Sequence, residues 1–266
     1  MREIPLLGMG TWGMGGRAEK DSSNDTQSIA ALQSGLDMGI NLIDTAEFYG
    51  AGHTEELVGK AISGRRRENL FLISKVWKTN LRHNDLLAAA KRSLDRLNTD
   101  YLDLYIIHWP NEEIPLQETM GALETLVGQK LVRTIGISNF SLELINEASR
   151  HLKNIQLAAN QIEYNLLHQE AAETIIPYCL KNNLHIIAYR PLARGDLTKT
   201  HTEILSKLAE KYQKTANQIA LNWLISQNIT VIPKSTNKEH LKENMGALGW
   251  NLSKEDIEAL RALPLK

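Results

Sequence analysis

Four side chains that together suit proton transfer occur in the first half of the chain: Asp44, Tyr49, Lys75 and His108. A phenol with an ordinary pKa of about 10 is a poor proton donor at neutral pH. A neighbouring ammonium stabilises the phenolate and lowers that pKa, and Lys75 can do this for Tyr49. Asp44 would hold the lysine charged and oriented, and His108 would hydrogen-bond a substrate oxygen. The set predicts an apparatus that makes or breaks a C–OH bond.

These side chains can meet only if the fold brings the ends of separate strands together. Eight short, nearly continuous apolar runs are typical of parallel strands that are covered on both faces. They recur at intervals of roughly thirty residues, which predicts an α/β fold of the (β/α)8 TIM-barrel type. Asp44, Lys75 and His108 end successive runs, at the end of the barrel where active sites lie. The runs are 6–11, 41–44, 70–75, 102–108, 134–138, 157–161, 185–189 and 230–233.

Amphipathic helical patterns fill the segments between these runs. Ser141, Thr215 and Ser253 suit helix N-caps, and Gly39 and Gly128 suit helix ends. One helix more than usual precedes the last strand, and a C-terminal helix follows it. We expect one domain over residues 1–266, and the alternative, a doubly wound open sheet, gives no reason for eight strands. The patterns cover 26–39, 85–97, 119–129, 141–150, 171–182, 203–212, 217–227, 239–248 and 253–263.

The composition excludes several classes of protein. The 266 residues include 30 Lys and Arg and 31 Asp and Glu, a formal net charge of −1, without the basic excess of a nucleic-acid binder. No apolar stretch approaches the roughly 20 residues of a membrane-spanning helix, and the N-terminus does not resemble a signal peptide. Cys179 is the only cysteine, and neither H-x-x-x-H nor C-x-x-C occurs, so we expect no metal site. The expected location is the cytoplasm.

Each of the four side chains also has an ordinary structural interpretation. Asp44 alone suits a loop cap, and Lys75 alone suits a lysine that extends from an apolar strand to the barrel rim. His108 alone suits a hydrogen-bonded histidine, and Tyr49 alone suits a loop aromatic. The reactive interpretation rests on their occurrence together at successive strand ends.

Eight short segments, among them those that contain these residues, carry a resemblance to a known family. The chain resembles the aldo-keto reductase family over nearly its whole length and in the family's order, most closely its compact microbial and archaeal members with alcohol dehydrogenase or carbonyl reductase activity. The resemblance implies a nicotinamide-dependent reductase with Asp44, Tyr49, Lys75 and His108 as its catalytic tetrad. Tyr49 would protonate the carbonyl oxygen and take the proton back in alcohol oxidation. The segments are LGMGTW, NLIDTAEFYGAG, ISKVW, LYIIHWP, IGISNF, NQIEYN, AYRPLARG and IPKST.

The expected cofactor is NADP(H), NAD(H) or both. No G-x-G-x-x-G follows a strand, so a Rossmann site is not indicated, whereas barrels often bind phosphate in the loops after strands seven and eight. Those loops contain Arg190, Leu192, Arg194, Lys234, Ser235 and Lys238, the last of which suits a solvated rim.

The resemblance assigns parts of the dinucleotide to particular residues. Lys234 and Ser235 would hold the adenosine ribose or its 2′-phosphate. His240 stands where the family's NADP-specific pattern usually has arginine, and because histidine lacks the guanidinium fork, we expect use of both cofactors. Glu243 and Asn244 would contact the adenine; Ser138, Asn139 and Gln161 would bind the carboxamide; and Tyr189 would stack on the nicotinamide or merely pack at the rim.

Aromatic residues are expected to form the substrate pocket. Trp12, Trp77 and Trp109 each follow a strand end by one or two residues, and Phe48 lies beside Tyr49. Such a collar suits a small apolar carbonyl compound. The loop after strand four is short and the chain ends soon after its last helix, which predicts an open pocket and broad specificity. Trp223 lies within a helix and is expected in the core.

Two other functions remain open from the sequence. The chain would be a cofactor-binding regulatory subunit without significant turnover, or a barrel enzyme that uses Lys75 as a Schiff-base nucleophile. The intact set of four residues favours the reductase. The expected partners are a small carbonyl or alcohol substrate and at most a weak homo-oligomer, with no nucleic acid or membrane.

Overall fold

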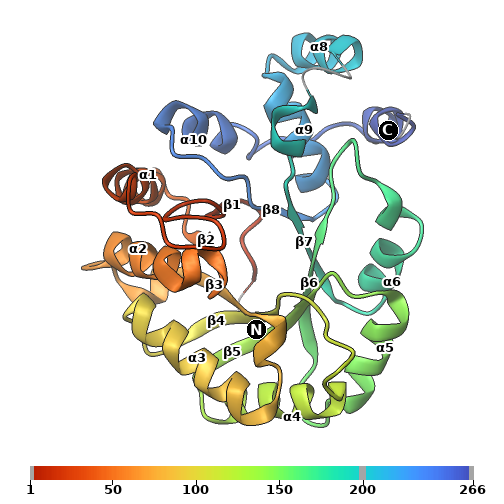
Figure 1. Ribbon diagram of the computed structural model, residues 1–266. Coiled ribbons are helices and arrows are strands. Elements are labelled where there is room, and N and C mark those ends of the chain that lie inside the picture. Colours follow the sequence, from red (N-terminus) through yellow and green to blue (C-terminus); the bar gives the residue numbers. More distant parts are fainter. Residues whose placement is uncertain (1–2, 198–201, 264–266) are drawn as a thin grey trace.

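Eight parallel strands form the centre of the molecule (Figure 1). The structure is a computed structural model that describes residues 3–197 and 202–263. The strands pair in chain order, each with the next, as the recurring units predict. They are β1 Gly8–Gly10, β2 Leu42–Asp44, β3 Phe71–Val76, β4 Leu102–Ile107, β5 Val132–Ser138, β6 Leu157–Glu163, β7 His185–Tyr189 and β8 Thr230–Val231.

The two outer strands meet and close the sheet into a barrel. Leu7 forms a parallel bridge with Val231, whose N–H donates to the Leu6 carbonyl over 2.9 Å. Gly10 N–H donates to the Pro233 carbonyl over 3.2 Å further along the same seam. A doubly wound sheet has two free edges, so that alternative is wrong.

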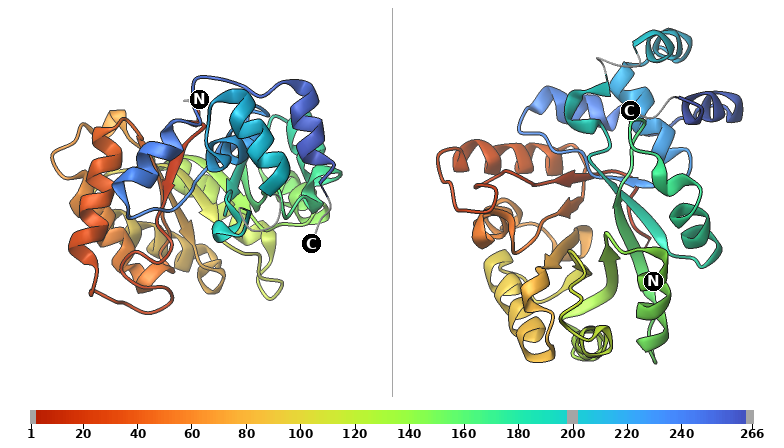
Figure 2. Two further views of the ribbon diagram at one scale, coloured as in Figure 1. Left: turned by 90° about the horizontal axis from the view of Figure 1, so that it is seen from above. Right: turned by 45° about the vertical axis from the view of Figure 1, so that its right-hand side comes forward.

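Helices surround the strands on the outside (Figures 1 and 2). Two helices, α8 and α9, lie between β7 and β8 in the chain, and α11 follows the last strand, which confirms the two additional helices of the prediction. The helices are α1 Asp25–Asp37, α2 His53–Ile62, α3 His83–Leu97, α4 Leu116–Gly128, α5 Leu142–His151, α6 Ile175–Lys181, α8 Thr202–Tyr212, α9 Ala216–Ile225, α10 Lys238–Met245 and α11 Lys254–Arg261.

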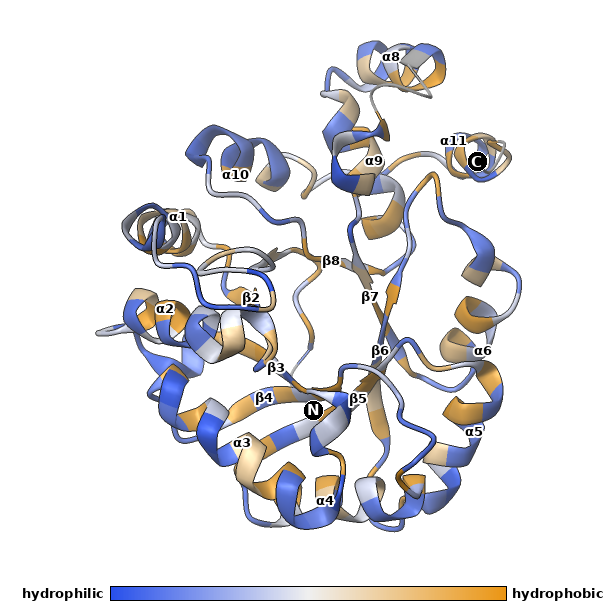
Figure 3. Cartoon of the chain, viewed as in Figure 1, coloured by the Kyte–Doolittle hydropathy of each residue, from blue (hydrophilic) through white to orange (hydrophobic). Residues whose placement is uncertain are grey.

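The strands separate two apolar layers. Inside the barrel, side chains such as Leu42, Ile73 and Leu104 form a small cluster, and a larger cluster lies between the strands and the helices. Figure 3 shows the corresponding pattern, with apolar residues concentrated on the strands and on the inner sides of the helices. Trp223 is fully buried in the larger cluster, as expected. Burial on both faces explains why the strands are nearly continuous apolar runs.

The predicted helix caps are largely confirmed. The side-chain oxygens of Ser141, Thr215 and Ser253 accept backbone N–H bonds at the starts of α5, α9 and α11. Gly39 follows α1 with a φ of 97°. Helix α4 ends at Gly128, as predicted, but the left-handed residue beyond this end is Lys130 and not a glycine.

The sequence interpretation missed α2. A glycine at residue 59 weakens its intrinsic helical pattern. In the fold, Leu57, Val58 and Ile62 of this helix are buried. A Cβ at Gly59 would lie 2.6 Å from the Arg96 carbonyl oxygen, so the glycine permits close contact with the end of α3. Tertiary packing therefore outweighs the local propensity.

Candidate active site

The alternation of side chains along each strand places the reactive groups inside the barrel mouth. On β3, Phe71 and Ile73 point into the inner cluster, and Lys75 continues the series two residues later. Leu42 precedes Asp44 on β2 in the same way. His108 follows Leu104 and Ile106 at the end of β4. The polar groups therefore form the last layer above an apolar interior.

Lys75 connects the reactive side chains. Its Nζ lies 2.7 Å from Asp44 Oδ2 and 3.3 Å from the Tyr49 hydroxyl, and it donates to the Thr45 carbonyl over 2.9 Å. The Lys75 side chain is fully buried, and Asp44 is 2% exposed. Gln161 Nε2 donates to the other Asp44 oxygen over 2.8 Å, so both carboxylate oxygens have partners. The amine is thereby aimed at the phenol.

A tight turn directs Tyr49 toward the amine. Tyr49 begins a short 3-10 turn, Tyr49–Gly52, in which Gly50, Ala51 and Gly52 have φ values of 56°, 52° and 93°. Gly50 N–H donates to the Arg17 carbonyl over 2.6 Å. The φ of 93° at Gly52 lies in the left-handed region that favours glycine, and a Cβ there would also displace the Arg96 guanidinium, which lies 2.7 Å away.

The electrostatics of Tyr49 differ from the expectation. Burial raises the pKa of the Tyr49 phenol above its ordinary value, and the charge of Lys75 offsets this only in part. The expected net lowering was therefore wrong for this structure, because removal of water disfavours the phenolate more than one ammonium stabilises it. The phenol consequently carries its proton at neutral pH, as a proton donor must.

The lysine is charged. Burial acts against the ammonium, but Asp44 and Tyr49 together raise the pKa of Lys75 above its ordinary value. A Schiff-base nucleophile must be a neutral amine. The contacts of Lys75 thus support an electrostatic part for it and give no support to the Schiff-base alternative.

His108 is neutral. Burial, with a smaller contribution from the charge of Lys75, lowers the pKa of His108 to about 2. Its ring centroid lies 5.5 Å from that of Tyr49, in an edge-to-face arrangement. A neutral imidazole carries one N–H donor, which suits a hydrogen bond to a carbonyl oxygen beside the phenol.

Aromatic rings line the mouth around these groups. Phe48 stacks on Trp77 with ring centroids 3.9 Å apart, and Trp12 lies edge-on to Tyr49 at 4.9 Å. Trp77 is in turn edge-on to His108 at 5.2 Å. Trp12 is 40% exposed and Trp109 is 42% exposed, so these two form the outer rim. The structure thus brings three of the four predicted pocket residues into mutual ring contact.

A second group of polar side chains lies beside the mouth at the ends of β5, β6 and β7. The Tyr189 hydroxyl donates to Asn139 Oδ1 over 2.9 Å, and Asn139 Nδ2 donates to Ser138 Oγ over 2.9 Å. The same Asn139 amide reaches the His108 carbonyl over 3.1 Å. Because Gln161 Nε2 is engaged by Asp44, its Oε1 is the atom left for a carboxamide. These contacts hold the Tyr189 ring at the edge of the mouth.

Cationic groups continue from there along the ends of β7 and β8. Arg190 Nη1 pairs with Glu163 at 2.8 Å, whereas Arg194 is exposed, and Leu192 packs against the core. Lys234 is exposed, and partial loss of water without a compensating charge lowers the pKa of its ammonium. Within the described ranges no carboxylate lies within ion-pair distance of this ammonium, so an anion such as a phosphate fits it.

Helix α10 carries the last predicted cofactor residues. Asn237 caps it by accepting from Glu239 N–H and His240 N–H, and Ser235 Oγ accepts from Asn237 N–H over 3.0 Å. His240 is exposed on the first turn, and Asn244 is buried. Glu243 accepts from the Thr215 hydroxyl over 2.6 Å, a contact with the start of α9 that the sequence did not suggest.

Sequence reasoning missed two acidic residues at this end of the barrel. Glu163 holds Arg190, and Glu47 binds the loop after β3. The position of Glu47, between an expected catalytic aspartate and tyrosine, was the available signal.

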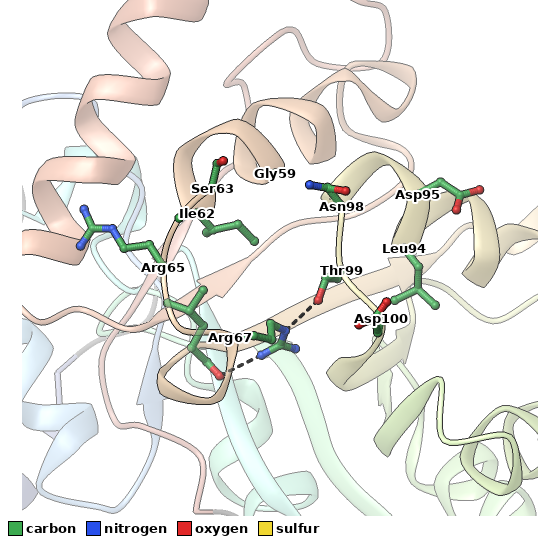
Figure 4. A pocket seen from close by; sticks show the side chains of 12 residues that line it. Gly59, Ile62, Ser63, Arg65, Arg67, Leu94, Asp95, Asn98, Thr99 and Asp100 are labelled. Atoms are coloured by element: carbon green, nitrogen blue, oxygen red, sulfur yellow. Dashed lines mark hydrogen bonds between the residues drawn. The ribbon is translucent and has the colours of Figure 1, made fainter.

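A cavity elsewhere on the molecule is not part of this site. It lies among the segments that lead from α2 to β3 and from α3 to β4, which are at the opposite, N-terminal ends of the strands (Figure 4). Its arginines are already paired: Arg67 donates to Thr99 over 2.9 Å and to Leu70 over 3.1 Å, and Arg65 to Asp37 over 2.5 Å. The candidate site is therefore the mouth at the C-terminal ends.

The fold and these groups define a class of protein, a barrel oxidoreductase with a buried Tyr–Lys–Asp group for proton transfer. The chain belongs to the aldo/keto reductase family, whose model matches residues 6–264. It is similar to the methylglyoxal reductase YeaE of Escherichia coli, with 35% identity over 97% of this chain and 90% of the relative. It is also similar to the glyoxal reductase of Bacillus subtilis, with 34% identity over 98% of this chain and 89% of the relative.

Solved structures agree with this membership. A thermostable aldo-keto reductase, Tm1743, solved with the inhibitor epalrestat, superimposes with a TM-score of 0.94 at 44% identity, over 97% of this chain and 95% of that one. An aldo/keto reductase of Klebsiella pneumoniae, solved with NADP and acetate, gives a TM-score of 0.87 at 35% identity, over 99% and 93%. The protein is an oxidoreductase of carbonyl compounds that uses a nicotinamide cofactor, and the regulatory-subunit alternative is not supported.

Proposed function

We propose that this protein reduces small aldehydes and ketones to alcohols, reversibly, with Tyr49 as the proton donor. One observation carries the assignment: a buried, charged Lys75 lies between Asp44 at 2.7 Å and the Tyr49 hydroxyl at 3.3 Å, at the mouth of the barrel. A bound reduced nicotinamide supplies the hydride that the carbonyl carbon receives.

The chain's own groups manage the proton. The Tyr49 hydroxyl donates its proton to the carbonyl oxygen as the C–OH bond is completed, and the neutral His108 imidazole donates a hydrogen bond to the same oxygen. The Lys75 ammonium stabilises the phenolate that remains, and Asp44 keeps the ammonium in place. Tyr49 regains a proton from solvent, and alcohol oxidation follows the reverse course.

We infer that the substrates are small carbonyl compounds that include 2-oxoaldehydes. The relatives named methylglyoxal and glyoxal reductases support this class. The aromatic collar of Trp12, Phe48 and Trp77 indicates that apolar aldehydes are also substrates, because ring faces favour flat, weakly polar groups. The exposed rim at Trp12 and Trp109 fits an open pocket with broad specificity.

The cofactor assignment rests on the polar and cationic side chains at the ends of β5 to β8. Ser138, Asn139 and Gln161 would hold the carboxamide, and Tyr189 would lie on the nicotinamide ring. Lys234 and Ser235 would hold the ribose or its 2′-phosphate, with Arg190, Leu192 and Arg194 along the diphosphate and Glu243 and Asn244 at the adenine. Solved relatives contain NADP or NADPH, and the Lys234 ammonium suits a phosphate.

We expect both NADPH and NADH to serve as cofactors, with His240 limiting the preference. Replacement of His240 by Arg should raise the ratio of the two cofactors' kcat/KM in favour of NADPH, because a guanidinium fork binds phosphate bidentately. Steady-state rates with each cofactor measure that ratio. An unchanged ratio would show that residue 240 does not face the 2′ position.

Replacement of Tyr49 by Phe tests the proton donor. The variant should lose about 10²–10⁴-fold in kcat, the range of general-acid catalysis, while its dissociation constant for NADPH stays close to that of the wild type. Cofactor binding is followed by quenching of tryptophan fluorescence, and turnover by loss of NADPH absorbance. Tyr178 on α6, whose hydroxyl donates to Asn146 Oδ1 over 2.9 Å, provides the matched control as Tyr178→Phe. Full activity of Tyr49→Phe would refute the assignment.

We further propose a single barrel domain over residues 1–266 that acts in the cytoplasm as a monomer or weak homo-oligomer. Among the described residues, no helix is long and apolar enough to cross a membrane. Light scattering over a range of protein concentrations measures the oligomeric state.

A further inference from the structure

Glu47 lies between the two loops that carry Phe48 and Trp77, whose stacked rings form the aromatic wall of the mouth. It precedes Phe48 in the loop after β2, and its Oε1 accepts the Trp77 backbone N–H over 2.7 Å. The same oxygen accepts Asn80 Nδ2 over 2.9 Å. One carboxylate oxygen thus fixes both the start and the end of the short turn that follows β3.

The Glu47 side chain is largely buried, unlike most glutamates, which face solvent. It is 8% exposed, and its other oxygen lies 4.0 Å from the guanidinium of Arg92 on α3. Burial of a carboxylate is costly unless hydrogen bonds compensate for the lost water. Here a backbone N–H, a side-chain amide and a distant cation provide that compensation.

The contact has a direct geometric consequence for the wall. Backbone N–H of Glu47 donates to the Lys75 carbonyl over 3.3 Å, so residue 47 is tied to β3 from both its backbone and its side chain. Phe48 is the next residue, and Trp77 is held through its own N–H. The rings of Phe48 and Trp77 accordingly stack at 3.9 Å with an angle of 17° between their planes.

The stacked pair stands next to the reacting groups. Trp77 is edge-on to His108 at 5.2 Å, and Phe48 lies at 6.4 Å from the same imidazole. A small substrate held by Tyr49 and His108 reaches little of this wall. The stacked rings of Phe48 and Trp77 offer a flat apolar surface within reach of a ring attached to the carbonyl group.

We propose that Glu47 is a positioning residue for substrate specificity: by fixing the Trp77 turn against Phe48, it sets the wall that binds the ring of aromatic aldehydes. The proposal rests on the reductase function proposed above. Glu47 does not contact the reacting atoms, and it acts through Phe48 and Trp77.

The test compares benzaldehyde with methylglyoxal as substrates, with NADPH at saturation. In Glu47→Ala, the KM for benzaldehyde should rise about tenfold with kcat nearly unchanged, because ring contacts contribute to ground-state and transition-state binding alike. The kinetic constants for methylglyoxal should change less than about threefold. In Glu47→Gln, the amide oxygen still accepts both hydrogen bonds, so most of the benzaldehyde affinity should return.

Glu112→Ala is the matched control, since this glutamate is exposed in the loop after β4. Equal losses for both substrates, or a loss in Glu47→Gln as large as in Glu47→Ala, would overturn the proposal. If Glu47→Ala does not fold, Asn80→Ala, which removes one of the two donors to Glu47, replaces it. This variant must raise the KM for benzaldehyde more than that for methylglyoxal. An unchanged ratio of the two KM values would overturn the proposal as well. A wild-type protein that reduces neither aldehyde would instead refute the proposed function.

Discussion

Removal of the ammonium beside Tyr49 is the most direct test of the electrostatic part assigned to Lys75. Lys75→Met alone would leave the carboxylate of Asp44 buried without its cation, which typically costs about 3–5 kcal/mol of stability. The double variant Asp44→Asn/Lys75→Met avoids this, because both partners become neutral. Gln161 can still donate to the oxygen of the new amide, as it now does to Asp44 over 2.8 Å.

The expected size of the effect follows from the distance between the two groups. At 3.3 Å, with an effective dielectric constant of about 20, two unit charges interact by about 5 kcal/mol, which is an upper bound for the Lys75 contribution. Loss of the ammonium disfavours the phenolate, and loss of the Asp44 charge favours it by a smaller amount, so the pKa of Tyr49, already raised by burial, should still rise. The proton should then be harder to release in reduction, and oxidation should need a higher pH, because less of Tyr49 is present as the phenolate that accepts the proton.

The assay is the pH dependence of kcat/KM for alcohol oxidation. The limb that reports ionisation of Tyr49 should move to higher pH in the double variant, and reductive kcat at neutral pH should fall about 10²–10⁴-fold. Asp44→Asn alone serves as the control for the change at residue 44. An unmoved limb, or reductive turnover within tenfold of the wild type, would refute an electrostatic role for Lys75.

Two further outcomes concern stability. Burial, and then the charge of Lys75, hold the pKa of His108 at about 2, so below a pH of about 6.5 the unfolded chain binds a proton that the folded protein does not. As the pH falls from about 6 to 4, this group should therefore lower the free energy of unfolding by about 1.4 kcal/mol per pH unit. In His108→Gln, the free energy of unfolding measured with urea should depend on pH with a slope smaller by that amount. Equal slopes in the variant and the wild type would contradict this expectation. Thr215→Ala removes the capping box at the start of α9 and should cost about 1 kcal/mol in urea unfolding, whereas Ser63→Ala at the end of α2 should cost far less; equal losses would show that the cap contributes little.

Much of the fold follows from patterns that are local in the chain. Runs such as 70–75 and 102–108 located β3 and β4 to within a residue or two, and Ser141, Thr215 and Ser253 marked three helix starts correctly. Such patterns reflect the period of a strand or helix and the needs of its first N–H groups, which do not depend on distant segments. Helix α2 was not predicted from local patterns, because its packing against α3, and not its own sequence pattern, stabilises it.

The sequence by itself determined which side chains stand at the strand ends, because the order of strands and the alternation along each of them place Asp44, Lys75 and His108 in one layer. Only the tertiary structure decided how those groups are charged. Burial depends on every element that closes over a site, and here it holds Tyr49 protonated and His108 neutral while Asp44 keeps Lys75 charged. The positioning role proposed for Glu47 also depends on the tertiary structure, because its partners on the loop after β3 come within hydrogen-bonding distance only when the barrel forms.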